Sequence, residues 1–329
     1  MQNKYRLFGN ELSPYSVKVR SYLRFKGIEH DWVVRNAATE DEFSRHAKLP
    51  LIPLLLTPEG EALQDSTPIL ETLEERYPEP SIVPKDPSLA FLSALLEEYA
   101  DEWLNKPMFH YRWYYEADAE SAADRLAASL MPGADPTTAR SMIRQRMVDR
   151  LPLVGSSAET KDTIESSYQR IVDLLEVHLS RRSYIFGERP ALADFGLFGQ
   201  LYQCQSDPTP GRLLRERAPH VQQWVERMLH PRTLGPFEKW DTLAPTLEPI
   251  FREEVALVFV PWTLANEQAL RNGRNQLEVQ IRGSVFRQTP QKYHAKSLGM
   301  LRQKYARIAD VADLRAILEQ TGCIAVFGS

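Results

Sequence analysis

The first residues whose types and spacing could do chemistry form the tetrapeptide Ser13-Pro14-Tyr15-Ser16. Its spacing is that of a Cys-x-x-Cys redox motif, but serine stands at both ends, which removes thiol–disulfide exchange. Serine followed by proline is also typical of a helix start, with Ser13 as the N-cap and Pro14 as the first helical residue. A hydroxyl there can accept from the helix backbone and still donate one hydrogen bond to an anion such as a thiolate. A plain cap and an anion-binding hydroxyl are both open at this point.

Other familiar chemistries leave no trace in the sequence. The seven histidines are scattered, without His-Glu-x-x-His or paired Cys/His spacing, so we expect no metal site. There is no glycine-rich phosphate-binding loop. The two cysteines, Cys204 and Cys323, lie far apart, which excludes a disulfide framework and fits a reducing compartment.

The elements that position the tetrapeptide alternate between strand and helix signals up to about Pro84 and are helical beyond it. We predict strands at 4–8 and 30–34, a helix over 13–26, two short strands within 49–63 and a helix over 65–80. Helical stripes follow at 89–103 and 164–179, with a loop at 130–136 and a linker at 240–249. Beyond the linker, an alternating stretch at 276–286 and further helices form an extension.

The amino-acid composition and net charge exclude several classes of function. The 329 residues are 43% hydrophobic and 26% charged, which is ordinary for a soluble globular protein. The net charge of -4 argues against a mainly nucleic-acid-binding chain. The N-terminus has no signal-peptide core, and no apolar run is long enough to span a bilayer, so we expect a cytoplasmic protein without membrane or nucleic-acid partners.

Four segments, in this order along the chain, resemble the glutathione transferase superfamily. They are Ser13-Pro14-Tyr15-Ser16, the loop Leu51-Ile52-Pro53-Leu54, the segment at 63–70 with Asp65-Ser66, and "GERPALADFGLFGQL" at 187–201. The resemblance implies an α/β thioredoxin-like N-terminal domain (1–84), an all-α C-terminal domain (85–240) and here a small mixed α/β extension (241–329). It also implies glutathione as co-substrate and a homodimer.

The resemblance assigns roles to these residues one by one. Ser13 would be the catalytic residue, donating a hydrogen bond to the glutathione thiolate, with Ser16 as the weaker candidate. Pro53, in a cis peptide with Ile52, would leave the backbone free to bind the cysteinyl part. Tyr15 and the Asp65-Ser66 pair complete the glutathione site, Ser66 holding the γ-glutamyl carboxylate at a helix start and Asp65 its ammonium.

The chain departs from the family pattern at two places. Leu51 stands where the family usually has a polar residue, which removes one ligand contact. Ala191 replaces a hydroxyl N-cap, which weakens that cap by about 1 kcal/mol unless Asp194 compensates. The second-substrate pocket, for an apolar electrophile, is expected between the domains, with Phe109, Trp113 and Tyr114 as its lining; the alternative for each ring is a place in the core.

The extension is strongly basic: nine Lys/Arg stand against one acid between Arg271 and Arg307. We expect this face to dock on the chain's own acidic residues, which are Glu71, Glu74, Glu75, Glu97, Glu98 and Asp101. Two functions therefore stand. The first is an enzyme that activates glutathione for attack on an apolar electrophile. The second is a non-catalytic binding or assembly module that offers its basic extension to an acidic partner.

Overall fold

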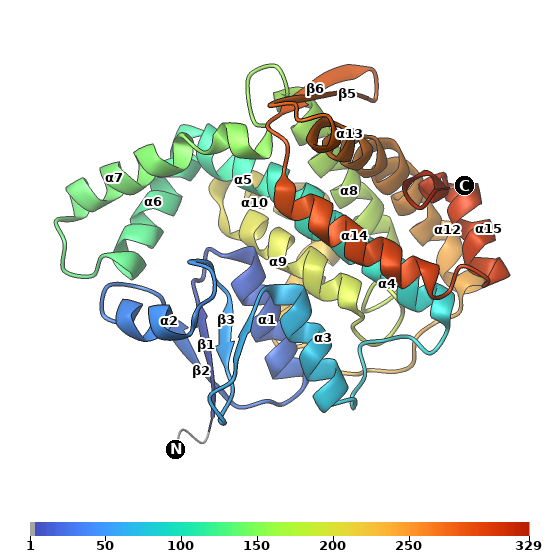
Figure 1. Ribbon diagram of the computed structural model, residues 1–329, viewed down its shortest axis with the longest axis horizontal. Helices are drawn as coiled ribbons and strands as arrows, with labels where there is room; N and C mark the ends of the chain where they lie inside the picture. Colours follow the sequence, from blue (N-terminus) through green and yellow to red (C-terminus); the bar gives the residue numbers. More distant parts are fainter. Residues whose placement is uncertain (1–3, 329) are drawn as a thin grey trace.

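The computed structural model describes residues 4–328 (Figure 1). Its first part contains a four-stranded sheet in the order β2-β1-β3-β4. Strand β1 (Tyr5–Gly9) pairs in parallel with β2 (His30–Val34) and antiparallel with β3 (Leu54–Leu56). Strand β3 pairs antiparallel with β4 (Ala62–Gln64). This mixed sheet is thioredoxin-like and confirms the fold predicted for the N-terminal part of the chain.

Alternating residues of the sheet bury its two faces against different helices. Leu7 and Leu55 join the core that includes α1 (Pro14–Phe25) and α3 (Ser66–Arg76). Phe8 and Leu54 point the other way and pack with Phe43 of α2 (Glu40–His46), a helix that the sequence pattern did not predict. The sheet is thus covered on both faces, and α1 is held on the side that meets the helical part of the chain.

The middle of the chain is helical, as predicted, and the loop predicted at 130–136 joins two of its helices. The hairpin of α6 (Glu116–Leu130) and α7 (Pro136–Val148) projects from one side of the body (Figure 1). No helix within residues 4–328 is long and apolar enough to cross a membrane. The segments are α4 (Pro87–Tyr99), the π-helical turn η1 (Ala100–Leu104), α5 (Asn105–Tyr114), α6 (Glu116–Leu130), α7 (Pro136–Val148), the short 3₁₀ segment η2 (Leu151–Val154), α8 (Lys161–Leu179), α9 (Leu192–Ser206), α10 (Pro208–Arg217) and α11 (Pro219–Met228).

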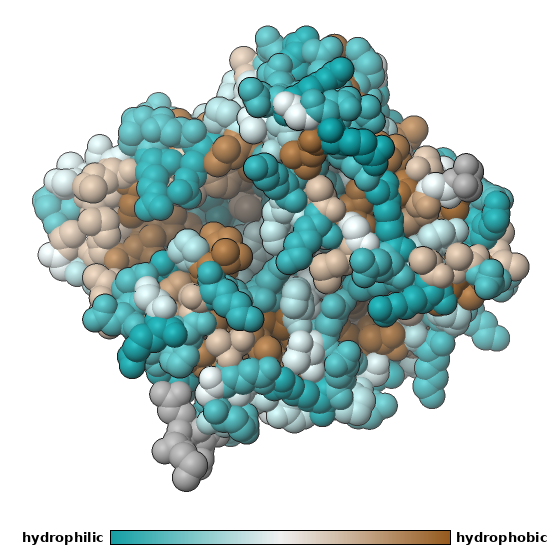
Figure 2. All heavy atoms as spheres, in the orientation of Figure 1, coloured by the Kyte–Doolittle hydropathy of each residue, from teal (hydrophilic) through white to brown (hydrophobic). Residues whose placement is uncertain are grey.

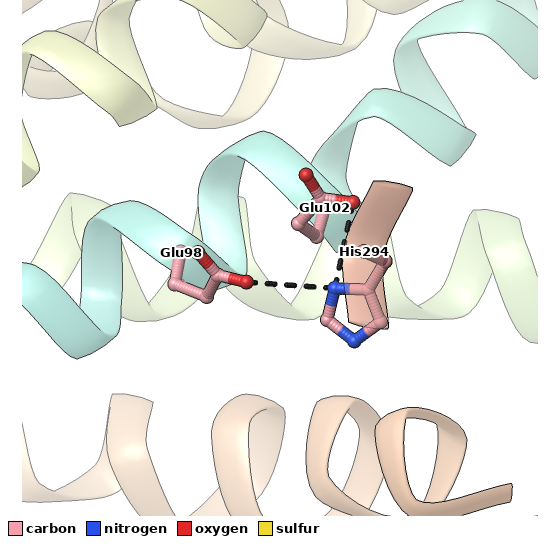
Figure 3. A group of neighbouring side chains, drawn as sticks. All are labelled: Glu98, Glu102 and His294. Carbon is pink, nitrogen blue, oxygen red and sulfur yellow. Dashed lines mark ion pairs between the residues drawn. The ribbon is translucent and has the colours of Figure 1, made fainter. Parts of the chain in front are cut away.

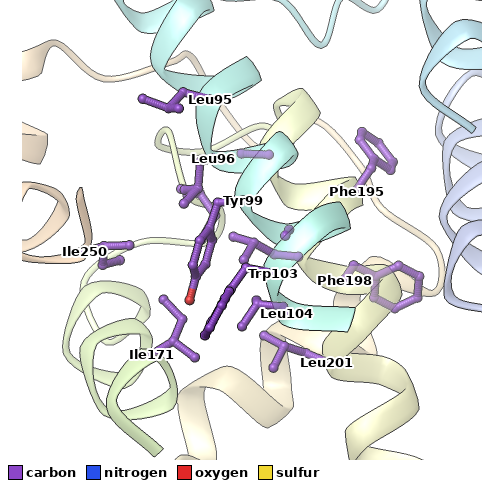
Figure 4. Close-up of a cluster of buried hydrophobic side chains, with 14 of the residues drawn as sticks. Leu95, Leu96, Tyr99, Trp103, Leu104, Ile171, Phe195, Phe198, Leu201 and Ile250 are labelled. Carbon is purple, nitrogen blue, oxygen red and sulfur yellow. The ribbon is translucent and has the colours of Figure 1, made fainter. Parts of the chain in front are cut away.

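Apolar side chains from α4, η1, α8 and α9 form the centre of the helical part, where Tyr99 and Trp103 are fully buried (Figure 4). The start of α9 lies in this core without a hydroxyl cap at Ala191. Asp194 compensates, because its carboxylate accepts from the backbone N–H of Ala191 at 2.8 Å and from the Trp224 indole at 3.0 Å. Asp194 therefore supplies one half of a capping box by accepting from the N–H of Ala191, which offsets part of the loss expected from the missing hydroxyl.

The extension is not separated from this body by a linker. Residues 240–249 form most of α12 (Trp240–Ile250), because Leu243, Leu247 and Ile250 bury a helical stripe despite two prolines. The alternating stretch is confirmed as the hairpin β5–β6, which turns at Arg282 and Gly283, both with positive φ. The remaining segments are η3 (Phe251–Phe259, π-helical), α13 (Val260–Arg271), β5 (Leu277–Ile281), β6 (Ser284–Gln288), α14 (Lys292–Ala306), α15 (Ala312–Thr321) and the 3₁₀ segment η4 (Cys323–Val326).

Docking of the extension on the chain's own acidic face is confirmed in part. Lys304 of α14 forms an ion pair with Glu71 of α3, and the Ser297 hydroxyl donates to Glu98 of α4 at 2.6 Å. Other basic residues pair outside the predicted acidic group, for example Arg302 with Glu267 on α13 at 2.6 Å. Helix α14 therefore lies along α4 and reaches α3, as Figure 1 shows.

Candidate active site

Ser13 caps α1. Its backbone is extended (φ -99°, ψ 113°), and its Oγ accepts from the Ser16 N–H at 3.2 Å. The Ser16 hydroxyl lies 2.9 Å from the same oxygen and is fully buried, whereas Ser13 is partly exposed. The Ser13 oxygen accepts from the protein, so its own hydrogen is free to be donated outward. This geometry favours Ser13 over Ser16 for contact with a ligand.

Close packing on α9 fixes the start of α1. A Cβ atom added to Gly199 would lie 2.7 Å from the backbone oxygen of Pro14, so only glycine allows this approach. Four residues further, Lys18 is buried and pairs with Glu97 and, at 2.6 Å, with Asp101. Burial by itself would lower the pKa of Lys18, but the two carboxylates outweigh burial and raise it. Lys18 therefore carries a full charge inside the protein and ties α1 to α4 and η1.

The peptide bond between Ile52 and Pro53 is cis, as the resemblance predicts. Gln64 of β4 holds the loop before it. Its side-chain amide donates to the carbonyls of Leu49 and Leu51, both at 2.7 Å, and its oxygen accepts from the Leu49 N–H at 3.0 Å. Leu51 itself is 60% exposed, so the loop presents an apolar side chain where the family has a polar one.

Asp65 and Ser66 start α3. Asp65 has a positive φ of 82°, and no side chain within residues 4–328 caps this helix. The first N–H groups of α3 are thus available to an anion, which a helix start also favours electrostatically. The Asp65 carboxylate accepts from the Tyr293 hydroxyl of α14, so the extension reaches the candidate ligand site directly.

A cavity of about 440 Å³ lies where the N-terminal domain, α4–η1 and α14 meet. Tyr15, Ile52, Pro53, Asp65 and Ser66 all line it, so the structure brings together the five residues assigned to glutathione binding. Figure 2 shows this face of the molecule hollowed beside the start of α14, with hydrophobic side chains along the edge. Ser13 does not itself line the cavity. Ser13 is two residues before Tyr15, which lines the cavity, and directly follows Leu12, which packs against the cluster around Trp113.

Tyr15 connects α1 to η1 and the start of α5, which also line the cavity. Its hydroxyl donates to the backbone oxygen of Asp101 at 2.9 Å and accepts from the Asn105 side chain at 3.2 Å. Burial, followed by the charges of Glu102 and Asp101, raises the pKa of Tyr15 well above its usual value. Tyr15 is therefore a neutral phenol that lines and braces the site rather than a source of phenolate.

The three aromatic residues expected in a second-substrate pocket do not line this cavity. Trp113 is only 2% exposed and packs against the alanine-rich face of the α6–α7 hairpin, with Phe109 beside it at a ring-centroid distance of 6.3 Å. Tyr114 stacks on His110 at 4.6 Å. Trp113 and Phe109 therefore lie against the hairpin and Tyr114 against His110, outside this cavity, and their role in binding a second substrate stays a prediction.

Helix α14 supplies the wall that the sequence did not identify. Tyr293, Lys296, Met300, Leu301 and Lys304 line the cavity from the extension. Their spacing of three and four residues is a helical stripe that mixes apolar, aromatic and basic side chains. That stripe was the only local signal, and nothing in it says which part of the chain it faces.

Comparisons with known proteins agree with this architecture. Residues 7–81 match the family model of the glutathione S-transferase N-terminal domain, and residues 156–227 match that of the C-terminal domain. An isoprene-epoxide glutathione S-transferase from Rhodococcus sp. (strain AD45) is 24% identical over 225 residues, covering 66% of this chain and 92% of that protein. A maleylacetoacetate isomerase from Pseudomonas aeruginosa is 35% identical over 88 residues, 25% of this chain and 42% of that protein.

Among solved structures, a β-etherase from Sphingobium sp. strain SYK-6 aligns with a TM-score of 0.47 and 22% identity, over 69% of this chain and 95% of that chain. The two family matches fall in order on the thioredoxin-like sheet with α1 and α3, and on α8–α11. The chain therefore belongs to the glutathione S-transferase superfamily.

Proposed function

We propose that this protein binds glutathione in the cavity and activates its thiol through Ser13 for attack on an apolar electrophile. The observation that carries the proposal is that Ile52, Pro53, Asp65 and Ser66 line one cavity although they come from two separate segments. The uncapped start of α3 suits the γ-glutamyl carboxylate, and Asp65 suits the neighbouring ammonium. The glutathione S-transferase of Rhodococcus, named for isoprene epoxide, supports an epoxide-like electrophile.

The chemistry requires a thiolate at neutral pH. A free thiol has a pKa of about 8.5, so only about 3% is ionised at pH 7. A hydrogen bond to a charged partner contributes about 1.5–3 kcal/mol, which corresponds to about one to two pKa units. One hydrogen bond from the Ser13 hydroxyl, aided by the start of α1, is enough to lower the pKa of a bound thiol to about 7. The thiol proton leaves to solvent, the thiolate sulfur bonds one epoxide carbon as that carbon's bond to oxygen breaks, and the resulting alkoxide takes a proton from water.

The second substrate would lie against residues other than the predicted aromatics. Leu49 and Leu51 from the cis-proline loop and Met300 and Leu301 from α14 give the cavity its apolar surface. We assign the second-substrate site to this surface, so the extension contributes directly to specificity. A homodimer and a cytoplasmic location remain part of the proposal.

The alternative is a module that offers its basic extension to an acidic partner. The ion pair between Lys304 and Glu71 counts against it, because that charge is already matched within the chain. The contact between Tyr293 and Asp65 favours it, since it occupies the carboxylate that a ligand ammonium would use, and so does Leu51, an exposed apolar residue where the family has a polar ligand contact.

Calorimetry with reduced glutathione tests binding, and the ultraviolet absorbance of the bound thiolate against pH tests activation. We expect millimolar or tighter binding, and Ser13→Ala to raise the pKa of the bound thiol by about one to two units with little change in affinity. Ser16→Ala is the matched control and should leave the pKa of the bound thiol unchanged. No binding at millimolar glutathione would remove the enzyme proposal, and an unchanged titration in Ser13→Ala would reduce Ser13 to a cap.

A further inference from the structure

Three side chains that can bind a metal meet at the contact between the extension and the helical body (Figure 3). Glu98 comes from the end of α4, Glu102 from the π-helical turn η1, and His294 from the start of α14. The Nδ1 atom of His294 lies 3.4 Å from a Glu98 oxygen and 3.5 Å from a Glu102 oxygen. In Figure 3 both carboxylates point at the same ring nitrogen.

The histidine is fully buried and its Nδ1 is unsatisfied. No hydrogen-bond partner for this atom exists among residues 4–328, since both carboxylates are beyond hydrogen-bond distance. The other ring nitrogen, Nε2, contacts the Thr263 hydroxyl. When the ring donates from Nε2, the lone pair on Nδ1 faces two carboxylate oxygens, and a cation bound between the three atoms would satisfy all of them.

The spacing fits a particular kind of cation. In a tetrahedral zinc site, ligand atoms lie about 2.0–2.2 Å from the metal, which sets them about 3.3–3.6 Å apart. The separations of 3.4 and 3.5 Å from Nδ1 to the two carboxylate oxygens fall within that range, and all three ligand atoms lie within 4.8 Å of one another. We propose that Glu98, Glu102 and His294 form a binding site for a divalent transition-metal ion of the Zn²⁺ type.

Surrounding contacts orient these ligands as in known metal sites. The Ser297 hydroxyl donates to the Glu98 oxygen at 2.6 Å, and the Thr263 hydroxyl contacts Nε2 of His294 and holds the ring in place. All three ligands line the cavity, so one coordination position would open towards the space that holds Asp65 and Ser66. The ion would clamp α14 onto α4 and present a Lewis-acidic face to the cavity, and this inference does not depend on the glutathione proposal.

The test is titration of the chelator-treated full-length protein with ZnCl₂ by calorimetry and with CoCl₂ by visible absorption. We expect one ion per chain, the strong d–d bands of tetrahedral Co²⁺, and a melting temperature that rises with added Zn²⁺. Glu102→Gln removes one ligand with little change in shape and should weaken binding at least about tenfold. His294→Asn should abolish the Co²⁺ bands.

Glu75→Gln is the matched control, because it removes one exposed acid from the neighbouring α3 and should leave binding unchanged. Absence of stoichiometric binding up to millimolar Zn²⁺ would overturn the proposal and leave the three side chains sharing a proton. Binding with equal affinity in wild type, Glu102→Gln and Glu75→Gln would overturn it too, whether or not His294→Asn folds. These outcomes are measured without glutathione, so they are separate from failure of the transferase proposal.

Discussion

Replacement of Lys18 by methionine tests how α1 is held in place. The Lys18 side chain is 1% exposed, and its Nζ is 2.6 Å from Asp101 and 3.0 Å from the Thr67 hydroxyl. It also pairs with Glu97, whose side chain is 3% exposed. Asp101 has a second oxygen without a hydrogen-bond partner among residues 4–328. Without the lysine, two carboxylates would remain buried with a single hydroxyl to satisfy them.

The cost follows from the orphaned charges rather than from the strength of the ion pairs. Breaking a buried pair by removing one partner destabilises a protein by about 3–5 kcal/mol, whereas replacing the whole set by neutral groups is often nearly neutral. We expect Lys18→Met to lower the melting temperature by roughly 6–15 °C, at about 2–3 °C per kcal/mol. Adding Glu97→Gln and Asp101→Asn to Lys18→Met should restore most of that loss.

Thermal unfolding followed by far-ultraviolet circular dichroism measures this prediction, with the exposed Lys85→Met as control. Two results would refute the reasoning. One is a Lys18→Met variant as stable as Lys85→Met, which would mean that the charge is not buried in solution. The other is a triple variant as unstable as the single one, which would mean that the side-chain packing, and not the charges, carries the effect.

Three further changes have defined outcomes. Gly199→Ala should lower the free energy of unfolding by about 1–3 kcal/mol, because the added Cβ clashes with Pro14. The same variant should have a lower melting temperature and a higher pKa of the bound thiol. Burial, and then the charge of Arg182, lowers the pKa of His178 to about 3, so stability present above pH 6.5 is lost as pH falls towards 3, by at most about 1.4 kcal/mol per pH unit. His178→Gln should flatten that slope in acid unfolding curves. Asp194→Ala removes the acceptor of three N–H donors and should cost about 3 kcal/mol or more in thermal unfolding.

The parts of the site that could be predicted from the sequence are those encoded within a few residues. The Ser13-Pro14 pair specifies a helix start by itself, and the structure has Ser13 as the N-cap. The cis bond at Ile52-Pro53 and the start of α3 at Ser66 follow from short motifs in a fixed order. Local backbone chemistry predicts the helix start at Ser13, whereas the cis bond and the role of Asp65-Ser66 are predicted from the family resemblance of those motifs.

What the sequence could not show depends on packing between distant segments. Lys18 falls on the same buried helical stripe as Tyr22, and only its acidic partners in α4 and η1 explain a lysine at that position. Trp113 suits a pocket or a core equally well until the α6–α7 hairpin is known to cover it. Glu102 and His294 carry no motif spacing, because η1 and α14 are adjacent only in the folded chain.

The extension belongs to the same core as the helical body. Ile250 packs in the cluster that contains Leu95 and Tyr99 (Figure 4), and the Tyr99 hydroxyl donates to the buried Glu254 of η3 at 3.1 Å. Glu254 in turn pairs with Arg170 of α8 at 2.9 Å, so both apolar and charged buried contacts join the extension to the helical body. An element attached in this way is positioned as firmly as the helices beneath it. Helix α14 joins this core through its own buried residues Leu298 and Leu301, so any ligand must match the size and charge of this wall as much as those of the thioredoxin-like domain.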